Sequence, residues 1–351
     1  MRRDPHSSPT EQSGARLSRR GMLQIAAAAV ALPAGVLGLR ELGRAPAPVQ
    51  WFGEVMNSPA RLTLWHPDPG VPRRTLVRVR AEVARLEAIF SLHHADSEVT
   101  RLNSAGRLGA PSHDLVSVLE LAQEVAVLSG GAFDPTIQPL WKAYAAHFAR
   151  PGSAPEGPDS ITLACLRPII GYEGIDAARQ KIRLARSGMA VSLNGIAQGY
   201  ITDRITDLLR NEGVDHAMVE MGETRALGAA PDGEPFPVHL MDPASPGRTN
   251  RRVDLADAAL SVSGGYGMLF SDKAHHLFDP ATGRSAQRMR EVAVTAPHAA
   301  VADALSTAIY VGGEAAAPAM LAAYPAARAW LTRNDGSRAA LITSPAGLGR
   351  S

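Results

Sequence analysis

The chain has 351 residues, of which 45% are hydrophobic and 20% are charged, and its formal net charge is +2. This composition is typical of a globular protein that is long enough for one large domain or two smaller ones. The chain contains no basic stretch with interleaved aromatic residues, which argues against a nucleic acid as its partner.

The excess of positive charge lies at the N-terminus. Residues 1–44 hold seven Lys or Arg and three Asp or Glu, so the remaining residues carry 29 basic and 31 acidic side chains. The run Ser-Arg-Arg-Gly-Met-Leu-Gln at 18–24 and the apolar stretch at 22–39 resemble a twin-arginine export signal. We therefore expect residues 1–44 to be a leader and linker, residues 45–351 to be the functional domain, and the protein to be periplasmic. Because about 18 apolar residues nearly suffice to span a bilayer, an uncleaved leader that tethers the protein to the membrane is the alternative.

The predicted elements follow the chain as short apolar patterns separated by polar or Gly- and Pro-rich segments. Stripes of apolar residues at helical spacing predict helices at 74–90, from Asp114 as N-cap to 130, at 196–210 and at 297–313. Short apolar runs predict strands at 55–65, 190–193, 217–221, 237–241, 259–263 and 291–295. Polar composition predicts loops at 91–98 and 150–159. This order predicts a mixed α+β fold with largely antiparallel sheets and packed helices, not a regular βαβ array.

The last expected helix carries a single carboxylate in apolar surroundings. Asp303 is the only charged residue between Pro297 and Gly313, and Thr307 follows it four residues later. Side chains at i and i+4 project side by side, so a carboxylate oxygen and a hydroxyl oxygen here can share a hard cation such as Mg²⁺. An Asp near a helix start and a Thr that bonds back to a backbone carbonyl would explain the same pair without a metal.

Four other segments place polar residues next to Gly or Pro at the ends of expected elements, where functional loops often lie. They are Gly-Gly-Ala-Phe-Asp-Pro-Thr at 130–136, Ser-Leu-Asn-Gly-Ile-Ala-Gln-Gly-Tyr at 192–200, Met-Gly-Glu-Thr-Arg-Ala-Leu-Gly at 221–228 and His-Leu-Phe-Asp-Pro-Ala-Thr-Gly at 276–283. The helix start in the second segment suits a phosphate, and the carbonyl of Gly195 could serve a cation. The pair Glu223 and Arg225 fits a structural salt bridge or a functional role equally well. His276 precedes a turn that can fix a side chain over a cleft, but the adjacent His275 leaves the assignment open.

Together these five segments resemble the ApbE family of FAD:protein FMN transferases over about residues 50–345. The run FSLHHADSEVTRLN at 90–103 also matches the family in order and spacing. The resemblance implies an ApbE-like, T-fold-like α+β fold and makes residues 45–351 a flavin transferase domain. It also implies a Mg²⁺-dependent cleavage of FAD that attaches FMN through a phosphoester to a Thr or Ser of an acceptor flavoprotein and releases AMP.

The resemblance assigns roles to the residues at matching positions. It implies that Asp303 and Thr307 bind the metal together with the carbonyl of Gly195. It implies that His276 polarises or deprotonates the attacking hydroxyl, and that Asp303 can share this work. Contacts to FAD are expected from His93, Ala132, Phe133, Asp134, Ser192, Asn194, Gln198 and Glu223.

The chain also departs from the family pattern. Ser192 and Asn194 stand where Asp-Leu-Gly is common, Gln198 stands in place of Lys, and His93 stands in place of an aromatic residue. With the twin-arginine leader, these departures resemble the accessory factor of nitrous oxide reductase systems. This implies a membrane-bound acceptor, with a nitrous oxide reductase regulatory flavoprotein as the specific candidate. Two alternatives remain open: an exported flavin-binding or carrier protein without transferase activity, and a Mg²⁺-dependent FAD pyrophosphatase that uses water in place of the acceptor hydroxyl.

Overall fold

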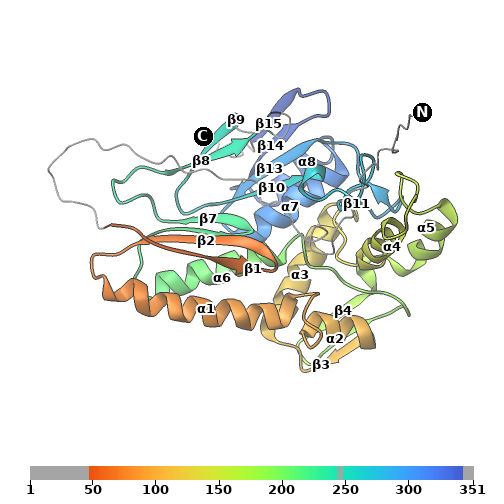
Figure 1. Ribbon diagram of the computed structural model, residues 1–351, viewed down its shortest axis with the longest axis horizontal. Helices are drawn as coiled ribbons and strands as arrows, with labels where there is room; N and C mark the ends of the chain where they lie inside the picture. Colours follow the sequence, from red (N-terminus) through yellow and green to blue (C-terminus); the bar gives the residue numbers. More distant parts are fainter. Residues whose placement is uncertain (1–46, 243–244, 246–247, 343–351) are drawn as a thin grey trace, which may run out of the picture.

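The computed structural model describes residues 47–242, 245 and 248–342 (Figure 1). The expected leader at 1–44 lies outside the described residues, so its assignment and the domain boundary at 44/45 stay predictions. Within the described ranges, no helix combines the length and the apolar character that crossing a bilayer requires.

The centre of the fold is an eight-stranded sheet in which every pair of neighbouring strands is antiparallel. In order across the sheet the strands are β1 (Val49–Val55), β2 (Ser58–Trp65), β6 (His216–Met221), β7 (Glu223–Leu227), β10 (Ala259–Gly264), β13 (Glu291–Ala296), β14 (Arg328–Thr332) and β15 (Arg338–Ile342). Two further pairs of strands and one three-stranded sheet lie around it.

Helices cover one face of the large sheet in two layers (Figure 1). The inner layer consists of α6 (Ala197–Asn211) and α7 (Ala299–Gly312), which contact the sheet and each other, and α1 (Gly70–Phe90) and α3 (His113–Leu128) lie over them. The hairpin of β8 (Phe236–Met241) and β9 (Thr249–Leu255) covers the opposite face. Because α7 lies between the sheet and α3, it is buried on nearly all sides, as the scarcity of charged residues at 297–313 indicates.

Alternation along the strands decides which side chains face α6 and α7. Leu260 of β10 belongs to the apolar cluster beneath β8 and β9, so its neighbours Ser261 and Ser263 face the helices. The same alternation on β7 turns Glu223 and Arg225 to the helix side. The neighbouring strands β7 and β10 therefore present polar side chains to the two inner helices.

The remaining helices and strands form a second region beside the large sheet. They are α2 (Glu98–Ala105), α4 (Gln138–Phe148), α5 (Ser160–Leu166), α8 (Ala317–Ala322), β3 (Arg107–Gly109), β4 (Ile175–Ala178), β5 (Lys181–Leu184), β11 (Phe278–Asp279) and β12 (Arg284–Ser285). Side chains of α4, α5 and β11 share an apolar cluster around Tyr144 and Phe278. This cluster supports the segments that border the pocket described below.

The fold class expected from the sequence is confirmed, since the structure is α+β with antiparallel sheets and packed helices. The four expected helices correspond to α1, α3, α6 and α7, and four of the six expected strands correspond to β6, β8, β10 and β13. The loops at 91–98 and 150–159 are also found, apart from the first residue of α2 at 98.

Two predictions about individual elements are wrong at the residue level. The single strand expected at 55–65 is a hairpin of β1 and β2, because Met56 and Asn57 adopt the positive φ values of 51° and 63° that reverse the chain. The helix cap is Ser112, whose side chain accepts from the N–H of Leu115, so Asp114 is not the N-cap. Asp114 lies in the first turn of α3 instead, where its carboxylate accepts from the side chains of Arg85 and Tyr200.

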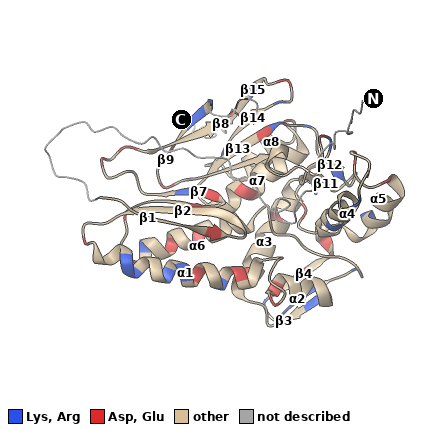
Figure 2. Ribbon diagram, viewed as in Figure 1, with Lys and Arg blue, Asp and Glu red and all other residues tan. Residues whose placement is uncertain are grey.

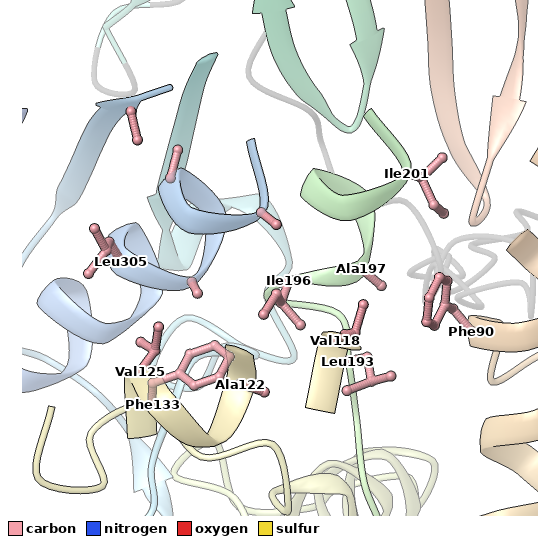
Figure 3. Packing of buried hydrophobic residues seen from close by; sticks show 14 of the residues in the cluster. Phe90, Val118, Ala122, Val125, Phe133, Leu193, Ile196, Ala197, Ile201 and Leu305 are labelled. Atoms are coloured by element: carbon pink, nitrogen blue, oxygen red, sulfur yellow. The ribbon is translucent and has the colours of Figure 1, made fainter. Parts of the chain in front are cut away.

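The strand expected at 190–193 is absent from the structure. The side-chain amide of Asn103 replaces a neighbouring strand, because its oxygen accepts from the Val191 N–H at 2.6 Å and its nitrogen donates to the Val191 carbonyl at 2.8 Å. Leu193 and Ile196 are buried in one apolar cluster with α3 side chains such as Val118 and with Phe133 (Figure 3). The segment that leads into α6 is therefore held by packing, by the Asn103 side chain and by a backbone bond from the Ser192 N–H to the Pro135 carbonyl at 2.7 Å.

Candidate functional site

One pocket collects nearly all of the residues that the sequence singled out. It lies where the N-terminal end of α6, the middle of α7 and the ends of β7 and β10 meet the segments at 132–137 and 264–278. Eleven of the twelve predicted site residues line it: Ala132, Phe133, Asp134, Ser192, Asn194, Gly195, Gln198, Glu223, His276, Asp303 and Thr307. Segments far apart in the sequence are therefore brought to one place, while the chemical roles of these residues stay predictions.

The twelfth predicted residue, His93, lies in a smaller pocket next to the first. The two pockets share Trp141, Asn194, Gln198 and Met268 as walls. His93 thus does not line the pocket that holds the acidic residues, but it lies in a neighbouring pocket with shared walls. Sequence reasoning missed Trp141 and Met268, because neither lies in one of the five motif segments.

The contacts of Asp303 and Thr307 differ from those of an Asp at a helix start and a Thr that bonds back to a helix carbonyl. Asp303 is 4% exposed, and one of its oxygens accepts from the N–H of Gly199 at 3.2 Å. In the part of the chain that the structure describes, no Lys, Arg or His side chain pairs with this carboxylate. The Thr307 hydroxyl contacts the Ser263 hydroxyl at 3.2 Å and forms no bond to a helix carbonyl among the described residues.

Gly195 permits a close approach to this pair. A Cβ atom at Gly195 would lie 3.2 Å from the Thr307 hydroxyl oxygen and 3.3 Å from a ring carbon of Phe133. Both distances are shorter than ordinary van der Waals contact, so a side chain here would crowd the pocket. A glycine at this position keeps the backbone next to Thr307.

Two acidic groups share the pocket and disfavour each other's charge. Burial raises the pKa of Asp303 well above its usual value, and the neighbouring Glu223 carboxyl raises it further. Burial also raises the pKa of Glu223 to about 7. Figure 2 marks in red the acidic positions on α6, β7 and α7. A bound cation would relieve the repulsion and favour both ionised forms.

The donor set fits a hard divalent cation such as Mg²⁺. Among the described residues there is no group of three or more His, Cys, Asp or Glu side chains placed to hold a metal. The pocket offers oxygen donors instead: a carboxylate, a hydroxyl and a backbone carbonyl. Mg²⁺ commonly binds one or two carboxylates and takes its other ligands from water and substrate phosphates, so a sparse set of protein oxygens is suitable.

The two adjacent histidines have different surroundings. The backbone carbonyl of Met268 lies 3.2 Å from Nδ1 of His276, and because a carbonyl only accepts, Nδ1 carries the hydrogen in the neutral ring. Nε2 of His276 is then an unprotonated acceptor, and burial lowers the pKa of this residue to about 4. His275 uses both ring nitrogens in the fold, through the carbonyl of Ala286 and the N–H of Leu277. His276 is therefore the one suited to act as a base.

Asp134 supports the pocket wall. Its carboxylate accepts from the N–H and the hydroxyl of Thr136 at 2.7 and 2.6 Å and from the N–H of Tyr172 at 3.0 Å. These bonds fix the turn that follows Phe133. Three donors occupy the carboxylate, so Asp134 contributes to the site through this structural role as well as by lining it.

The structure reveals a polar contact that the sequence did not indicate. Arg225 does not pair with Glu223 but donates to Asp203 of α6 at 2.6 Å. The oxygens of Asp203 also accept from the N–H groups of Ala299 and Ala300 at 2.8 and 3.0 Å. Asp203 thus caps the start of α7 from a neighbouring helix and fixes the helix that carries Asp303.

Gly199 sets the distance between α6 and α7. A Cβ atom at this position would lie 2.5 Å from the carbonyl oxygen of Ala299 and 2.7 Å from the Cα of Ala300. We expect Gly199→Ala to destabilise the protein by about 2 kcal/mol or more, because overlap with backbone outweighs the gain of about 1 kcal/mol in helix propensity. Thermal unfolding measures the change. Gly109→Ala is the control, since no atom lies within 4 Å of its Cβ position; equal melting temperatures for the two variants would contradict the packing argument.

The comparison with known protein families assigns the chain. A model of the ApbE family matches residues 56–331, which is more than half of the sequence. The chain belongs to the ApbE family. The expectation drawn from the five segments is therefore confirmed, and the pocket described above is the pocket of an ApbE family member.

Relatives of this ApbE family member are FAD:protein FMN transferases. The FAD:protein FMN transferase of Treponema pallidum is 31% identical over 261 residues, which cover 68% of this chain and 71% of that protein. The FAD:protein FMN transferase of Haemophilus influenzae is 28% identical over 256 residues, which cover 69% and 73% of the two chains. The solved structure of the flavin transferase ApbE from Vibrio cholerae matches with a TM-score of 0.72 at 24% identity and covers 85% of this chain and 98% of that chain. This last likeness shows the shared fold.

Proposed function

We propose that this ApbE family protein is a Mg²⁺-dependent FAD:protein FMN transferase. The observation that carries the proposal is the composition of one pocket, in which the buried Asp303 and the half-buried Glu223, neither with a cationic partner among the described residues, lie with His276. The family membership and the names of the relatives support the same activity. The substrate would be FAD, and the product would be an acceptor protein that carries FMN.

Asp303, Thr307 and the carbonyl of Gly195 would hold the metal. Mg²⁺ at this place would neutralise charge on the pyrophosphate of FAD and orient it for displacement. The N-terminal end of α6 also borders the pocket and favours a phosphate through its N–H groups and its dipole. Positioning and charge neutralisation are the main requirements of phosphoryl transfer, and these groups supply both.

An unpartnered amide supports a polar ligand in the pocket. The side-chain nitrogen of Gln198 is buried and has no hydrogen-bond partner among the described residues, although it borders both pockets. A buried donor without a partner is costly, and an oxygen of FAD would satisfy it. Phe133, whose ring lies next to Gly195, would contact the flavin nucleotide.

His276 would accept the proton of the attacking hydroxyl at Nε2. The oxygen of an acceptor Thr or Ser then bonds to the phosphorus on the FMN side, and the bond from that phosphorus to the AMP oxygen breaks. AMP leaves with the electron pair of that bond, and the hydroxyl proton stays on His276 until it is released. Nδ1 keeps its hydrogen bond to Met268 throughout, which holds the ring in place.

The location and the acceptor are part of the same proposal. The twin-arginine motif at 18–24 supports export to the periplasm, with a membrane tether if the leader is retained. The substitutions at Ser192, Gln198 and His93 support a subfamily that serves a membrane-bound flavoprotein, such as the regulatory flavoprotein of nitrous oxide reductase systems.

One experiment tests the proposed reaction. The purified protein is incubated with FAD, Mg²⁺ and the soluble domain of the candidate acceptor, and intact-protein mass spectrometry follows the acceptor. We expect a mass increase equal to one esterified FMN and the release of AMP in equal amount. FMN and AMP without labelled acceptor would show a pyrophosphatase instead, and bound FAD without any turnover would show a carrier.

A further inference from the structure

Three serines lie directly behind Thr307, between β10 and α7. Ser261 and Ser263 face α7 from the strand, Ser306 faces the strand from the helix, and their exposed fractions are 1%, 8% and 0%. The Ser263 hydroxyl oxygen lies 3.2 Å from that of Thr307 and 2.8 Å from that of Ser306. The Ser306 oxygen lies 2.9 Å from the backbone carbonyl oxygen of Asp303. A line of contacts therefore runs from the pocket wall at Thr307 to the backbone of Asp303.

The direction of these hydrogen bonds follows from counting hydrogens. A carbonyl oxygen only accepts and a hydroxyl has one hydrogen to donate, so Ser306 donates to the carbonyl of Asp303. Ser306 must then accept at its contact with Ser263, which means that Ser263 donates there. The hydrogen of Ser263 is thereby committed, so Ser263 accepts from Thr307. The carbonyl at one end fixes the orientation of every hydroxyl in the line.

We propose that Ser263 and Ser306 are positioning residues that turn the hydroxyl hydrogen of Thr307 away from the pocket and leave its oxygen lone pairs facing a divalent cation. The inference rests on the metal site of the proposed function. A hydroxyl binds a cation through its lone pairs, and a hydrogen directed into the pocket would repel the cation. The two serines would therefore raise the affinity of the site without touching the metal.

Packing alone does not explain serines at these positions. The surrounding helix residues Ala302 and Leu305 are apolar, and buried strand positions ordinarily favour β-branched side chains. Burying a hydroxyl costs free energy unless it is hydrogen-bonded, and here the bonds lead to a pocket atom. Ser261 contacts Ser306 at 3.1 Å and also reaches the Glu223 carboxyl, so the same cluster extends to the second acid.

The test measures metal binding directly, without turnover. Mn²⁺ is titrated in the presence of ADP, which supplies a pyrophosphate but no flavin, and free Mn²⁺ is followed by electron paramagnetic resonance. We expect Ser263→Ala and Ser306→Ala each to weaken Mn²⁺ binding roughly 10-fold, as loss of a group that orients a metal ligand commonly does. Ser263→Thr keeps the hydroxyl and should keep the affinity. Thr206→Val is the matched control, because it removes a buried hydroxyl that donates to the Thr202 carbonyl at 2.8 Å, outside the pocket lining.

A double-mutant cycle separates positioning from general damage. In the Thr307→Val background there is no hydroxyl hydrogen to orient, so adding Ser263→Ala should change Mn²⁺ affinity no further. An equal 10-fold loss in that background would overturn the inference. Unchanged affinity of Ser263→Ala alone, with weakened Thr307→Val, would also overturn it and leave the proposed function standing. Unchanged affinity of Thr307→Val, or no Mn²⁺ binding by the unaltered protein, would overturn the metal assignment itself.

Discussion

Replacing Asp303 by Asn should abolish FAD cleavage while leaving the protein at least as stable as before. Loss of the only carboxylate predicted to bind the metal should lower the rate by roughly 10³-fold or more, which corresponds to about 4 kcal/mol of transition-state stabilisation. The stability of the folded protein without metal should not decrease. Asp303 is buried with no cationic partner among the described residues, and its raised pKa means that folding disfavours its ionised form, a cost that Asn does not carry. The Asn oxygen can still accept from the Gly199 N–H.

The measurement pairs FAD cleavage with thermal unfolding in the presence and absence of Mg²⁺. Mg²⁺ should raise the melting temperature of the unaltered protein and leave that of Asp303→Asn unchanged, because ligands stabilise only the state that binds them. Asp114→Asn is the matched control. Its carboxylate is also buried, but it accepts from Arg85 at 2.7 Å and from Tyr200 at 2.8 Å, so its loss should lower stability and spare activity. Full cleavage activity in Asp303→Asn would rule out the metal assignment.

The sequence predicts both inner helices and most of the strands that flank the site. Apolar residues at helical spacing marked α6 and α7, and short apolar runs marked β6, β10 and β13, because these elements bury a continuous face. The same rule failed at 190–193, where the apolar run is buried but Asn103 pairs its backbone from 88 residues away. A local pattern can report burial, but it cannot report which group satisfies the backbone.

The residues that line the site were predictable in part from the sequence. The segments that line the pocket carry recognisable motifs, and the family resemblance placed them together. The contacts that fix their geometry join distant segments: Asp203 caps α7 from 96 residues earlier, and Ser263 meets Thr307 only because β10 lies against that helix. Such pairs depend on strand order and helix packing, which no single segment encodes.

The family resemblance pointed to His276 rather than His275, and the contacts of the two rings supply the physical reason, which leads to the second large effect. Replacing His276 by Asn should lower FMN transfer to the acceptor by roughly 10²- to 10⁴-fold, the usual contribution of a general base. The Asn side-chain nitrogen can still donate to the Met268 carbonyl, so the variant removes the base at Nε2 while keeping the local hydrogen bond. Single-turnover transfer to the acceptor measures the effect, and added imidazole should restore part of the rate in His276→Gly.

The protonation of His276 supplies an independent check. Burial lowers its pKa to about 4, so the ring should be neutral, with hydrogen on Nδ1, at every pH at which transfer is assayed. Nitrogen-15 NMR of labelled histidine should show this tautomer and no titration until the pH approaches 4, whereas an unperturbed histidine titrates near 6.5. Since the unfolded chain binds this proton between about 6.5 and 4 and the folded chain does not, the group lowers stability as the pH falls through that window. A His276 signal that titrates near 6.5, together with full transfer by His276→Asn, would exclude His276 as the base.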